Sequence, residues 1–493
     1  MQFASVNYIL FLALGVVVYY ALPGARSRTW WLLGASIAFY YTLSAAWTAV
    51  LVAVVVVGFV GGLAISHARD ARAAHRRLVI SVVLAAGVLA VFKYAGFASS
   101  VVRDLVSATG GSPGFSLLRL ALPVGVSFWT FQTIAYLVDV RRGRIPAEKD
   151  FARYALFVSF FAHVTAGPIA RGSQLLPQLA RRYRFSYENM RSALVLMGWG
   201  FFKKLVVADP LGVVANTVYA DPQAWPGATH GTVLLVATLA FAVQIYCDFS
   251  GYTDIARGSA RLFGVELARN FDRPYFSRSV KEFWRRWHMS LMAWLKDYIY
   301  IPLGGSRVSA ARKHANVMAV FLVSGLWHGA GYTFLLWGAI NGVYQILGDL
   351  TAGLRRRIAG AMRINTDTPL WRLVQVLTTF CLITVGWVFF RAESVSDALY
   401  ILPRMLIPTP AVFSDGTFLH LGLSKPQTIV AAAGALCVVA MDFFSMKLDL
   451  PRILYTRPVT VRWTAYVLLV VAVVVFGHYG PVYNASDFAY FKF

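Results

Sequence analysis

The sequence predicts an all-α polytopic membrane protein, and two observations carry this prediction. Of the 493 residues, 58% are hydrophobic and 14% are charged, and the mean hydropathy is +0.60. This balance lies far from that of soluble globular proteins. Many apolar runs also reach the ~20 residues that a helix needs to cross ~30 Å of hydrocarbon. Helices fit runs of this length because backbone polar groups in lipid must be satisfied internally.

Five apolar runs open the chain, at residues 6–22, 29–43, 47–65, 78–97 and 117–138. No basic segment precedes the first run, which predicts a retained membrane helix rather than a cleaved signal. Basic loops follow the first, third and fifth runs. Because cytoplasmic loops are enriched in Lys and Arg, we expect these loops in the cytoplasm and the N-terminus outside.

The next apolar stretch is expected to be broken or re-entrant. It reads YALFVSFFAHVTAGPIAR, is interrupted at Gly167 and Pro168, and leads directly to Arg171. A full crossing would carry the following arginines to the outside, against the usual charge bias. Irregular backbone at membrane depth is tolerated where it lines protein or a water-filled cavity.

Two further runs, at 193–207 and 231–249, carry charged residues. Lys203 and Lys204 interrupt the first run. Asp248 and Asp254 stand where the second run leaves the membrane. We expect these carboxylates to cap helices rather than to bind a ligand.

Residues 254–315 are expected to form a re-entrant or amphipathic region on the cytoplasmic face. Between Asp254 and Lys313 there are twelve Lys or Arg against five Asp or Glu, and no run long enough to span lipid. A basic amphipathic helix of this kind can lie in the interface plane, with His288 toward its apolar side. Its apolar side chains recur at Val280, Trp284, Trp287, Leu291, Trp294 and Tyr298.

The remaining apolar runs are 316–336, 337–350, 371–390, 428–444 and 463–478. Together the runs predict roughly ten to twelve crossings, with re-entrant and interfacial helices besides. We expect a single integral-membrane domain over residues 1–493 and an external C-terminal tail at 481–493.

The net charge of +24 does not predict nucleic-acid binding. Lys and Arg fall between the apolar runs and form no continuous basic face, so membrane lipid is the expected neighbour. Cys247, Cys381 and Cys437 lie in or beside apolar runs without CxxC spacing and are interpreted as packing residues. The histidines are too scattered to predict a metal site.

His328 stands within an apolar run, in the segment SGLWHGAGY. An ionisable residue in such a run is costly and marks a functional site by default. Burial would keep the imidazole neutral, and a neutral imidazole can take a proton from a hydroxyl that attacks an acyl carbon. The alternatives are a histidine that serves packing alone and the proton relay of a secondary transporter. Transport lacks the expected internal repeat and paired intramembrane carboxylates.

His288, 40 positions before His328, is the second candidate. A histidine among interfacial tryptophans is often only an amphipathic anchor, which is the alternative. Asn341 lies in the run after His328 and is expected to orient a ring or to stabilise charge, with helix packing as the other interpretation.

Several long segments are similar to those of a known family. They are LPVGVSFWTFQTIAYLVDVRRG, SFFAHVTAGPIAR, QIYCDFSGYTDIARGSARLFGV, NFDRPYFSRSVKEFWRRWH, then WRRWHMSLMAWLKDYIYIPLGG and LWHG. Together they resemble the membrane-bound O-acyltransferase family, in its bacterial alginate O-acetyltransferase-like branch. The resemblance implies the fold of that family around a central funnel. It also puts His328 in the position of the catalytic histidine and His288 in that of the second characteristic histidine.

The resemblance further implies an O-acyltransferase with no resident cofactor. Its donor substrate would be acetyl-CoA, or another acyl thioester, taken from the cytoplasm. The acetyl group would cross the bacterial inner membrane for O-acetylation of an exported, alginate-like polysaccharide, with a periplasmic SGNH-type or related acetyltransferase as partner. Teichoic acid, peptidoglycan and lipid-linked glycans stay open as acceptors. Supporting or substrate-binding roles are predicted for Trp287, Trp327, Asn341 and Asp297.

The end of the chain carries the sequence F-x-Y-F, formed by Phe488, Tyr490 and Phe491. It resembles a terminal motif of this branch that carries the acyl group onward. We therefore predict Tyr490 as an acyl relay, with an aromatic anchor at the membrane interface as the alternative.

Overall fold

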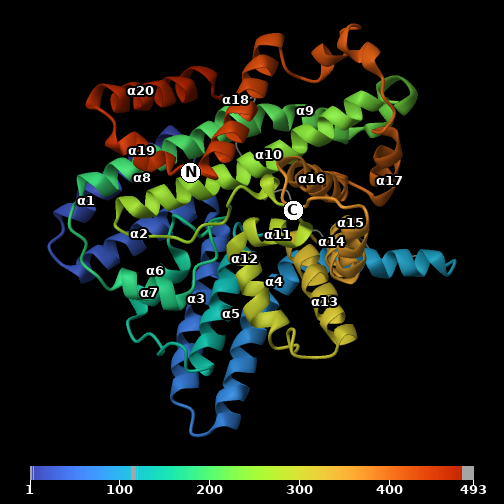
Figure 1. Cartoon of the computed structure of the whole chain (residues 1–493). Helices are drawn as coiled ribbons and strands as arrows, with labels where there is room; N and C mark the ends of the chain where they lie inside the picture. Colours follow the sequence, from blue (N-terminus) through green and yellow to red (C-terminus); the bar gives the residue numbers. More distant parts are fainter. Residues whose placement is uncertain (1–2, 4, 113–117, 119, 480–493) are drawn as a thin grey trace. The chain divides into compact units, whose positions relative to one another are not determined.

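The computed structural model describes residues 3, 5–112, 118 and 120–479 (Figure 1). Regular structure in this part of the chain is entirely helical, which confirms the predicted all-α class. Packing divides the chain into two compact units, Met1–Met197 with Tyr252–Ala268 and Gly198–Gly251 with Arg269–Phe493. The single domain over residues 1–493 stays a prediction, and the predicted tail at 481–493 lies outside the described residues.

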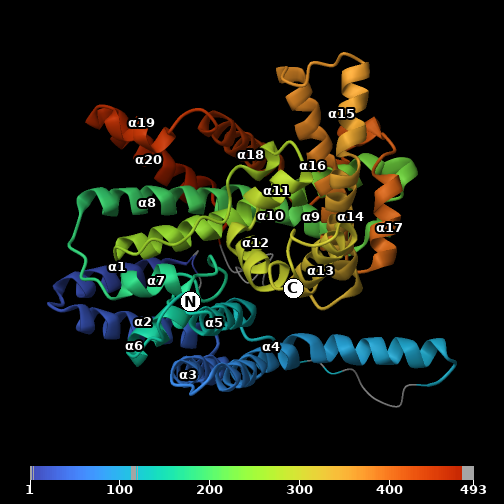
Figure 2. The ribbon, with the colours of Figure 1, turned by 60° about the horizontal axis from the view of Figure 1, so that its bottom comes forward.

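The first unit is built around three long helices that lie side by side, α3, α4 and α5 (Figure 1, Figure 2). Close packing of α3 on α5 needs glycine, because a Cβ atom at Gly62 would lie 2.6 Å from the Tyr136 ring. The helices of this unit are α1 (Val6–Ala21), α2 (Ala25–Leu43), α3 (Ala45–Ser66), α4 (Ala71–Ala108), α5 (Val126–Arg141), α6 (Phe151–Ser159) and α7 (Gly172–Leu179).

The predicted broken helix is confirmed in the first unit. Helix α6 ends at Ser159, and α7 begins at Gly172. The chain between them is non-helical and almost wholly buried in protein. The break starts before the predicted Gly167, because the Phe161 N–H donates to the Ser36 hydroxyl of α2 at 3.1 Å instead of continuing the helix.

The second unit holds the remaining helices, and α8 (Tyr187–Phe201) and α10 (Gly227–Leu262) contribute residues to both units. Its core is rich in aromatic rings from α11, α14 and α16. The other helices of this unit are η1 (Phe202–Ala208), α9 (Asp209–Ala220), η2 (Pro222–Ala224), η3 (Pro274–Phe276), α13 (Ala310–His328), α14 (Tyr332–Leu350), α15 (Ala352–Ala361), α16 (Pro369–Arg391), α17 (Val395–Arg404), η5 (Pro410–Phe413), η6 (Thr417–His420), α18 (Lys425–Ser445), α19 (Leu450–Thr456) and α20 (Val459–Phe476).

The single amphipathic helix predicted from Val280 to Tyr298 is wrong. The segment forms α11 (Val280–Arg286), α12 (Met289–Leu295) and the π-helix η4 (Lys296–Tyr300). The chain breaks at His288, whose backbone takes the left-handed conformation with φ of 45°. The apolar stripe from Val280 to Trp294 is buried inside the protein, so it does not lie on a membrane surface.

The capping role predicted for Asp248 is also wrong, because α10 continues through this residue to Leu262. Instead, Asp248 joins a buried ionic cluster in the second unit. The Lys204 Nζ lies 2.7 Å from the Asp248 carboxylate and 2.8 Å from that of Asp209. In the first unit, Asp254 likewise lies inside α10 and pairs with Arg257 at 3.6 Å. Placing two carboxylates around one ammonium keeps Lys204 charged in an interior that would otherwise exclude it.

Helices α13 and α14 form a close antiparallel pair in the second unit. A Cβ atom at Gly338 would collide with the carbonyl oxygen of Phe321, and one at Gly325 would collide with that of Phe334. Small residues at such a contact let two helix backbones approach. Packing against α14 fixes the position of the C-terminal end of α13, and the last residue of α13 is His328.

Among the described residues, six helices are long and apolar enough to cross a membrane. They support the prediction of a multi-pass integral membrane protein. Many apolar side chains on them are exposed, including Val83, Leu436 and Val474, as expected where lipid surrounds a helix. The orientation of the termini stays a prediction. The six are α3, α4, α10, α16, α18 and α20.

Replacing Gly338 with alanine is expected to push α14 from α13 and to lower stability by about 1–3 kcal/mol, as overpacking does. The matched control is Gly348→Ala on the same helix, where a Cβ atom would meet nothing within 4 Å. Thermal unfolding of the purified protein in detergent measures both. Equal melting temperatures for the two variants would contradict the close-packing argument.

Candidate active site

The structure brings the two candidate histidines together. The ring centroids of His288 and His328 lie 6.3 Å apart, with their planes at 62°. Both side chains are buried, with exposed fractions of 1% and 5%. His288 immediately precedes α12, and His328 is the last residue of α13. Residues 40 positions apart therefore meet in one interior site of the second unit.

His288 is positioned by a turn that Asn270 holds. The backbone N–H of Met289 donates to the Asn270 carbonyl at 2.9 Å, and that of Ser290 donates to the Asn270 side chain at 3.2 Å. Asn270 itself is buried. No sequence pattern predicts this role of Asn270, whose only local sign is its place at the start of the NFDRPYF segment.

Aromatic rings surround the His288 imidazole edge-on. The centroid of Phe249 lies 4.7 Å from it and that of Trp327 5.5 Å. Burial lowers the pKa of His288 to about 3. The ring is therefore neutral at physiological pH and can donate or accept a proton or hydrogen bond without carrying charge.

His328 sits in an aromatic cage at the end of α13. Its ring lies 4.9 Å from Trp327, 5.0 Å from Trp337 and 5.3 Å from Phe390, all edge-on. The helix stops at Gly329, where a Cβ atom would collide with the Phe334 ring. A larger residue there would displace Phe334, which packs edge-on against Phe390 of the cage at 5.2 Å. The glycine thus lets the chain pass close to the Phe334 ring directly after the histidine.

Asn341 anchors tryptophans rather than contacting an imidazole. Its side-chain oxygen accepts a hydrogen bond from the Trp284 indole at 3.2 Å, and its amide donates to the Trp337 carbonyl at 2.8 Å. Trp284 in turn packs edge-on against Trp337 at 5.5 Å. The ring that Asn341 orients is therefore Trp284, one ring removed from His328.

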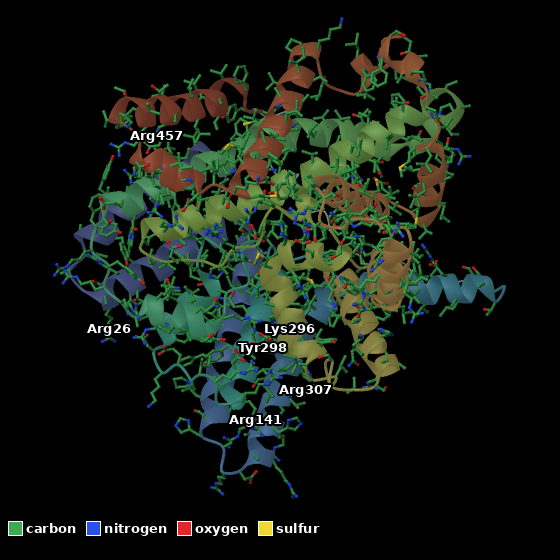
Figure 3. All side chains as sticks on the ribbon, viewed as in Figure 1. Arg26, Arg141, Lys296, Tyr298, Arg307 and Arg457 are labelled. Atoms are coloured by element: carbon green, nitrogen blue, oxygen red, sulfur yellow. The ribbon has the colours of Figure 1, made fainter. Side chains whose placement is uncertain are left out.

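The other predicted supporting residues fall into different surroundings. Trp327 contacts both histidines, as described above. Trp287 turns to the aromatic core, where it stacks on Phe283 at 5.3 Å and packs on Trp387 at 5.0 Å. Asp297 is partly buried in η4, between Lys296 and Tyr298 in the chain. Figure 3 labels these two neighbours. Tyr490 lies outside the described residues.

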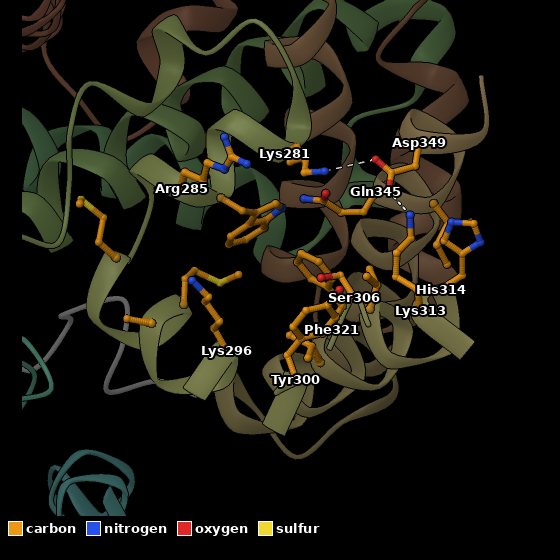
Figure 4. Close-up of a pocket in the computed structure, with 17 residues that line it drawn as sticks. Lys281, Arg285, Lys296, Tyr300, Ser306, Lys313, His314, Phe321, Gln345 and Asp349 are labelled. Atoms are coloured by element: carbon orange, nitrogen blue, oxygen red, sulfur yellow. Dashed lines mark hydrogen bonds and ion pairs between the residues drawn. The ribbon is translucent and has the colours of Figure 1, made fainter. Parts of the chain in front are cut away.

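A basic cavity of about 590 Å³ lies in the second unit, lined by residues of α11 to α14 (Figure 4). Four cationic side chains line it, with a single carboxylate, that of Asp349. Lys281 and Lys313 both pair with this carboxylate, at 3.3 and 3.1 Å. An excess of positive charge therefore faces the cavity. The cationic residues are Lys281, Arg285, Lys296 and Lys313.

Neither histidine lines the cavity, but one ring, that of Trp337, connects its wall to His328. Trp284 and Phe321 line the cavity, and Trp284 packs on Trp337, which contacts His328. Met289, the residue after His288, also lines it. The sequence showed the basic residues at 281, 285 and 296 as the polar side of a helix. Only the fold joins them with Lys313 around one space.

Within the described ranges, no group of three or more His, Cys, Asp or Glu side chains is placed to hold a metal ion. What the site offers instead is two closely placed imidazoles in an apolar, ring-lined interior. Such an arrangement suits proton transfer at a substrate heteroatom.

The family model described as the membrane-bound O-acyltransferase family matches residues 118–390, more than half of the chain and a range that includes both histidines. The chain belongs to the membrane-bound O-acyltransferase family. This assignment confirms the resemblance and makes the protein an acyltransferase, in place of the transporter alternative.

Several known proteins are similar to the chain, two of the three named here over most of its length. A probable alginate O-acetylase AlgI of Pseudomonas aeruginosa is 36% identical over 456 residues, which cover 91% of this chain and 82% of the relative. A peptidoglycan O-acetyltransferase of Helicobacter pylori is 32% identical over 80% of this chain and 78% of its own. A teichoic acid D-alanyltransferase of Bacillus subtilis is 25% identical over 45% of this chain and 57% of its own.

Proposed function

We propose that the protein takes acetyl groups from acetyl-CoA in the cytoplasm and moves them across the inner membrane for O-acetylation of an exported, alginate-like polysaccharide. The observation that carries the proposal is a buried, ring-lined histidine pair with a basic cavity close by, lined by the residue after His288 and by residues of the helix that ends at His328. The similarity to alginate O-acetylases over 91% of the chain supports this acceptor class.

His328 acts as the general base in this proposal. It takes the proton of the acceptor hydroxyl, whose oxygen attacks the carbonyl carbon of the acetyl thioester. The thiolate that leaves then takes this proton from the His328 imidazolium. The end of α13 favours the imidazolium formed between these steps, because the partial negative charge of a helix C-terminus stabilises a cation. His288, neutral and edge-on to the same tryptophan, orients the reacting group.

The cavity holds the charged end of the donor. Along α13, the 15 residues from Lys313 to His328 correspond to about 22 Å at ~1.5 Å per residue. A donor that contacts both Lys313 and His328 needs an anionic head group at one end and a long, narrow arm that carries the thioester at the other. Acetyl-CoA has this form, and the cationic lining attracts its phosphates.

Tyr490 receives the acetyl group in our proposal and passes it to a periplasmic SGNH-type acetyltransferase, which acetylates the polymer. The C-terminal F-x-Y-F sequence supports this step. Peptidoglycan, teichoic acid and lipid-linked glycans are the competing acceptors. Peptidoglycan has the support of the Helicobacter pylori relative, which is named for that acceptor.

Replacing His328 with alanine is expected to lower acetyl transfer about 10²- to 10⁴-fold, the usual contribution of a general base. The assay supplies acetyl-labelled CoA to the purified protein and follows labelled product and free thiol. His420→Ala, an exposed histidine of η6 outside the cavity, is the comparison and is expected to keep full transfer. Undiminished transfer or thioester cleavage in the His328 variant would sink the proposal.

Replacing Arg285 and Lys296 with glutamine is expected to raise the KM for acetyl-CoA by about tenfold or more with little change in kcat. Each hydrogen bond between charged groups contributes about 1.5–3 kcal/mol, and neither residue forms the Asp349 pairs. Arg356→Gln with Arg357→Gln, exposed on α15, provides a control of equal charge change. A KM that rises equally in the control pair would indicate a general surface-charge effect and contradict the cavity as donor site.

Mass spectrometry of the C-terminal peptide tests the relay. After incubation with acetyl-CoA, the peptide is expected to gain one acetyl group at Tyr490 in the unmodified protein. No gain is expected in Tyr490→Phe or in His328→Ala. An unacetylated Tyr490 in protein that still transfers acetyl groups would leave direct transfer to the partner as the route.

A further inference from the structure

We propose that the Ser324 hydroxyl donates the hydrogen bond that stabilises the oxyanion formed on the acetyl group, an inference that rests on the acetyl transfer proposed above. Ser324 lies one turn before His328 on α13 and is only 1% exposed. Its Oγ atom has no hydrogen-bond partner among the residues that the structure describes. A buried hydroxyl without a partner costs stability, so a ligand that accepts its hydrogen bond is the natural counterpart.

The hydroxyl of Ser324 differs from those of two other buried serines in the described helices, Ser36 and Ser159. A helical serine commonly donates to the carbonyl four residues before it. Ser36 donates in this way to Leu32 at 2.7 Å, and Ser159 to Ala155 at 2.7 Å. The Ser324 hydroxyl makes no such bond with its own helix and is left available to the interior of the site.

The position of Ser324 on α13 points it toward the histidine pair. At about 100° per residue, Ser324 lies between Trp327 and His328 around the helix. Both of these rings contact His288, at 5.5 and 6.3 Å. A side chain between them therefore faces the space where the two histidines meet.

The same face of α13 also lines the basic cavity. Lys313, Val317 and Val320 line the cavity, and Ser324 and His328 continue their helical spacing. A donor arm that extends from the cavity toward His328 would thus pass Ser324 before it reaches the imidazole. Side chains on a helix lean toward its N-terminus, so the His328 ring leans toward Ser324, about 5–6 Å away between Cβ atoms.

The close contact with α14 is made by the next residue, Gly325, where a Cβ atom would collide with the Phe334 carbonyl. Ser324 lies about 100° away from Gly325 around the helix, on the side of His328.

His328 and Ser324 act on different atoms in the same transfer step. His328 takes the proton of the acceptor hydroxyl while the hydroxyl oxygen bonds to the thioester carbonyl carbon. The electron pair of the carbonyl double bond moves to its oxygen, and the Ser324 O–H donates a hydrogen bond to this oxyanion. When the carbonyl re-forms, the carbon–sulfur bond breaks and the thiolate receives the proton from the His328 imidazolium. Ser324 keeps its own proton throughout.

Kinetics of Ser324 variants with acetyl-labelled CoA test the inference. Ser324→Ala is expected to lower kcat about 10²- to 10³-fold, as loss of one oxyanion donor does, with an unchanged KM for acetyl-CoA. Ser324→Thr keeps a hydroxyl and is expected to stay within about tenfold of the unmodified protein. Ser277→Ala, another buried serine of the second unit whose Oγ atom has no described partner, is expected to keep full kcat.

Other outcomes overturn the inference. A Ser324→Ala protein with unmodified kcat, alongside loss of transfer in His328→Ala, removes the oxyanion role and leaves the proposed function standing. A Ser324→Thr protein as slow as the alanine variant also overturns it, because the hydroxyl would not be what matters. No transfer by the unmodified protein removes both proposals. If the alanine variant fails to fold, Ser324→Cys, which is close in volume and a weak donor, is measured in its place and is expected to show a lowered kcat.

Discussion

The turn at His288 is the constraint on which the geometry of the site depends. Helical continuation from α11 into α12 would carry the imidazole away from α13, whereas the left-handed residue and the hydrogen bonds to Asn270 redirect the chain. A non-glycine residue in that conformation is strained and persists where its surroundings hold it. The buried Asn270 supplies the hydrogen bonds that do so.

The second histidine is fixed by helix packing rather than by hydrogen bonds from a loop. Gly325 and Gly338 let α13 and α14 approach closely, and this contact sets the position of the C-terminal end of α13 along α14. Trp337 and Phe390, from α14 and α16, then enclose His328. Because rings fill the space on these sides, water has little access to the imidazole, and charges that develop there interact strongly in a low dielectric.

Charge is distributed unequally between the two ends of the site. Lys and Arg side chains line the cavity, and the Asp349 carboxylate neutralises only part of their positive charge. Uncharged aromatic rings surround the histidines instead. A donor with an anionic head and a neutral reactive end matches this distribution, because its charge stays where cations meet it. The proposed chemistry then needs only hydroxyl, imidazole and thioester groups in the apolar part, with Ser324 facing the developing charge.

The sequence by itself determined the membrane class and the broken helix after α6, and it singled out His328 and His288 as candidates, which the structure places 6.3 Å apart. These follow from local properties, namely the length of apolar runs, the position of glycine and proline, the cost of histidine among apolar residues, and motifs that resemble a family. Only the tertiary structure decided the break at His288, the use of Asn341 by Trp284, and the pairing of Asp248 with Lys204. Each of these depends on groups far apart in the chain, and helical periodicity says nothing about which distant hydrogen-bonding or charged group will meet a given side chain.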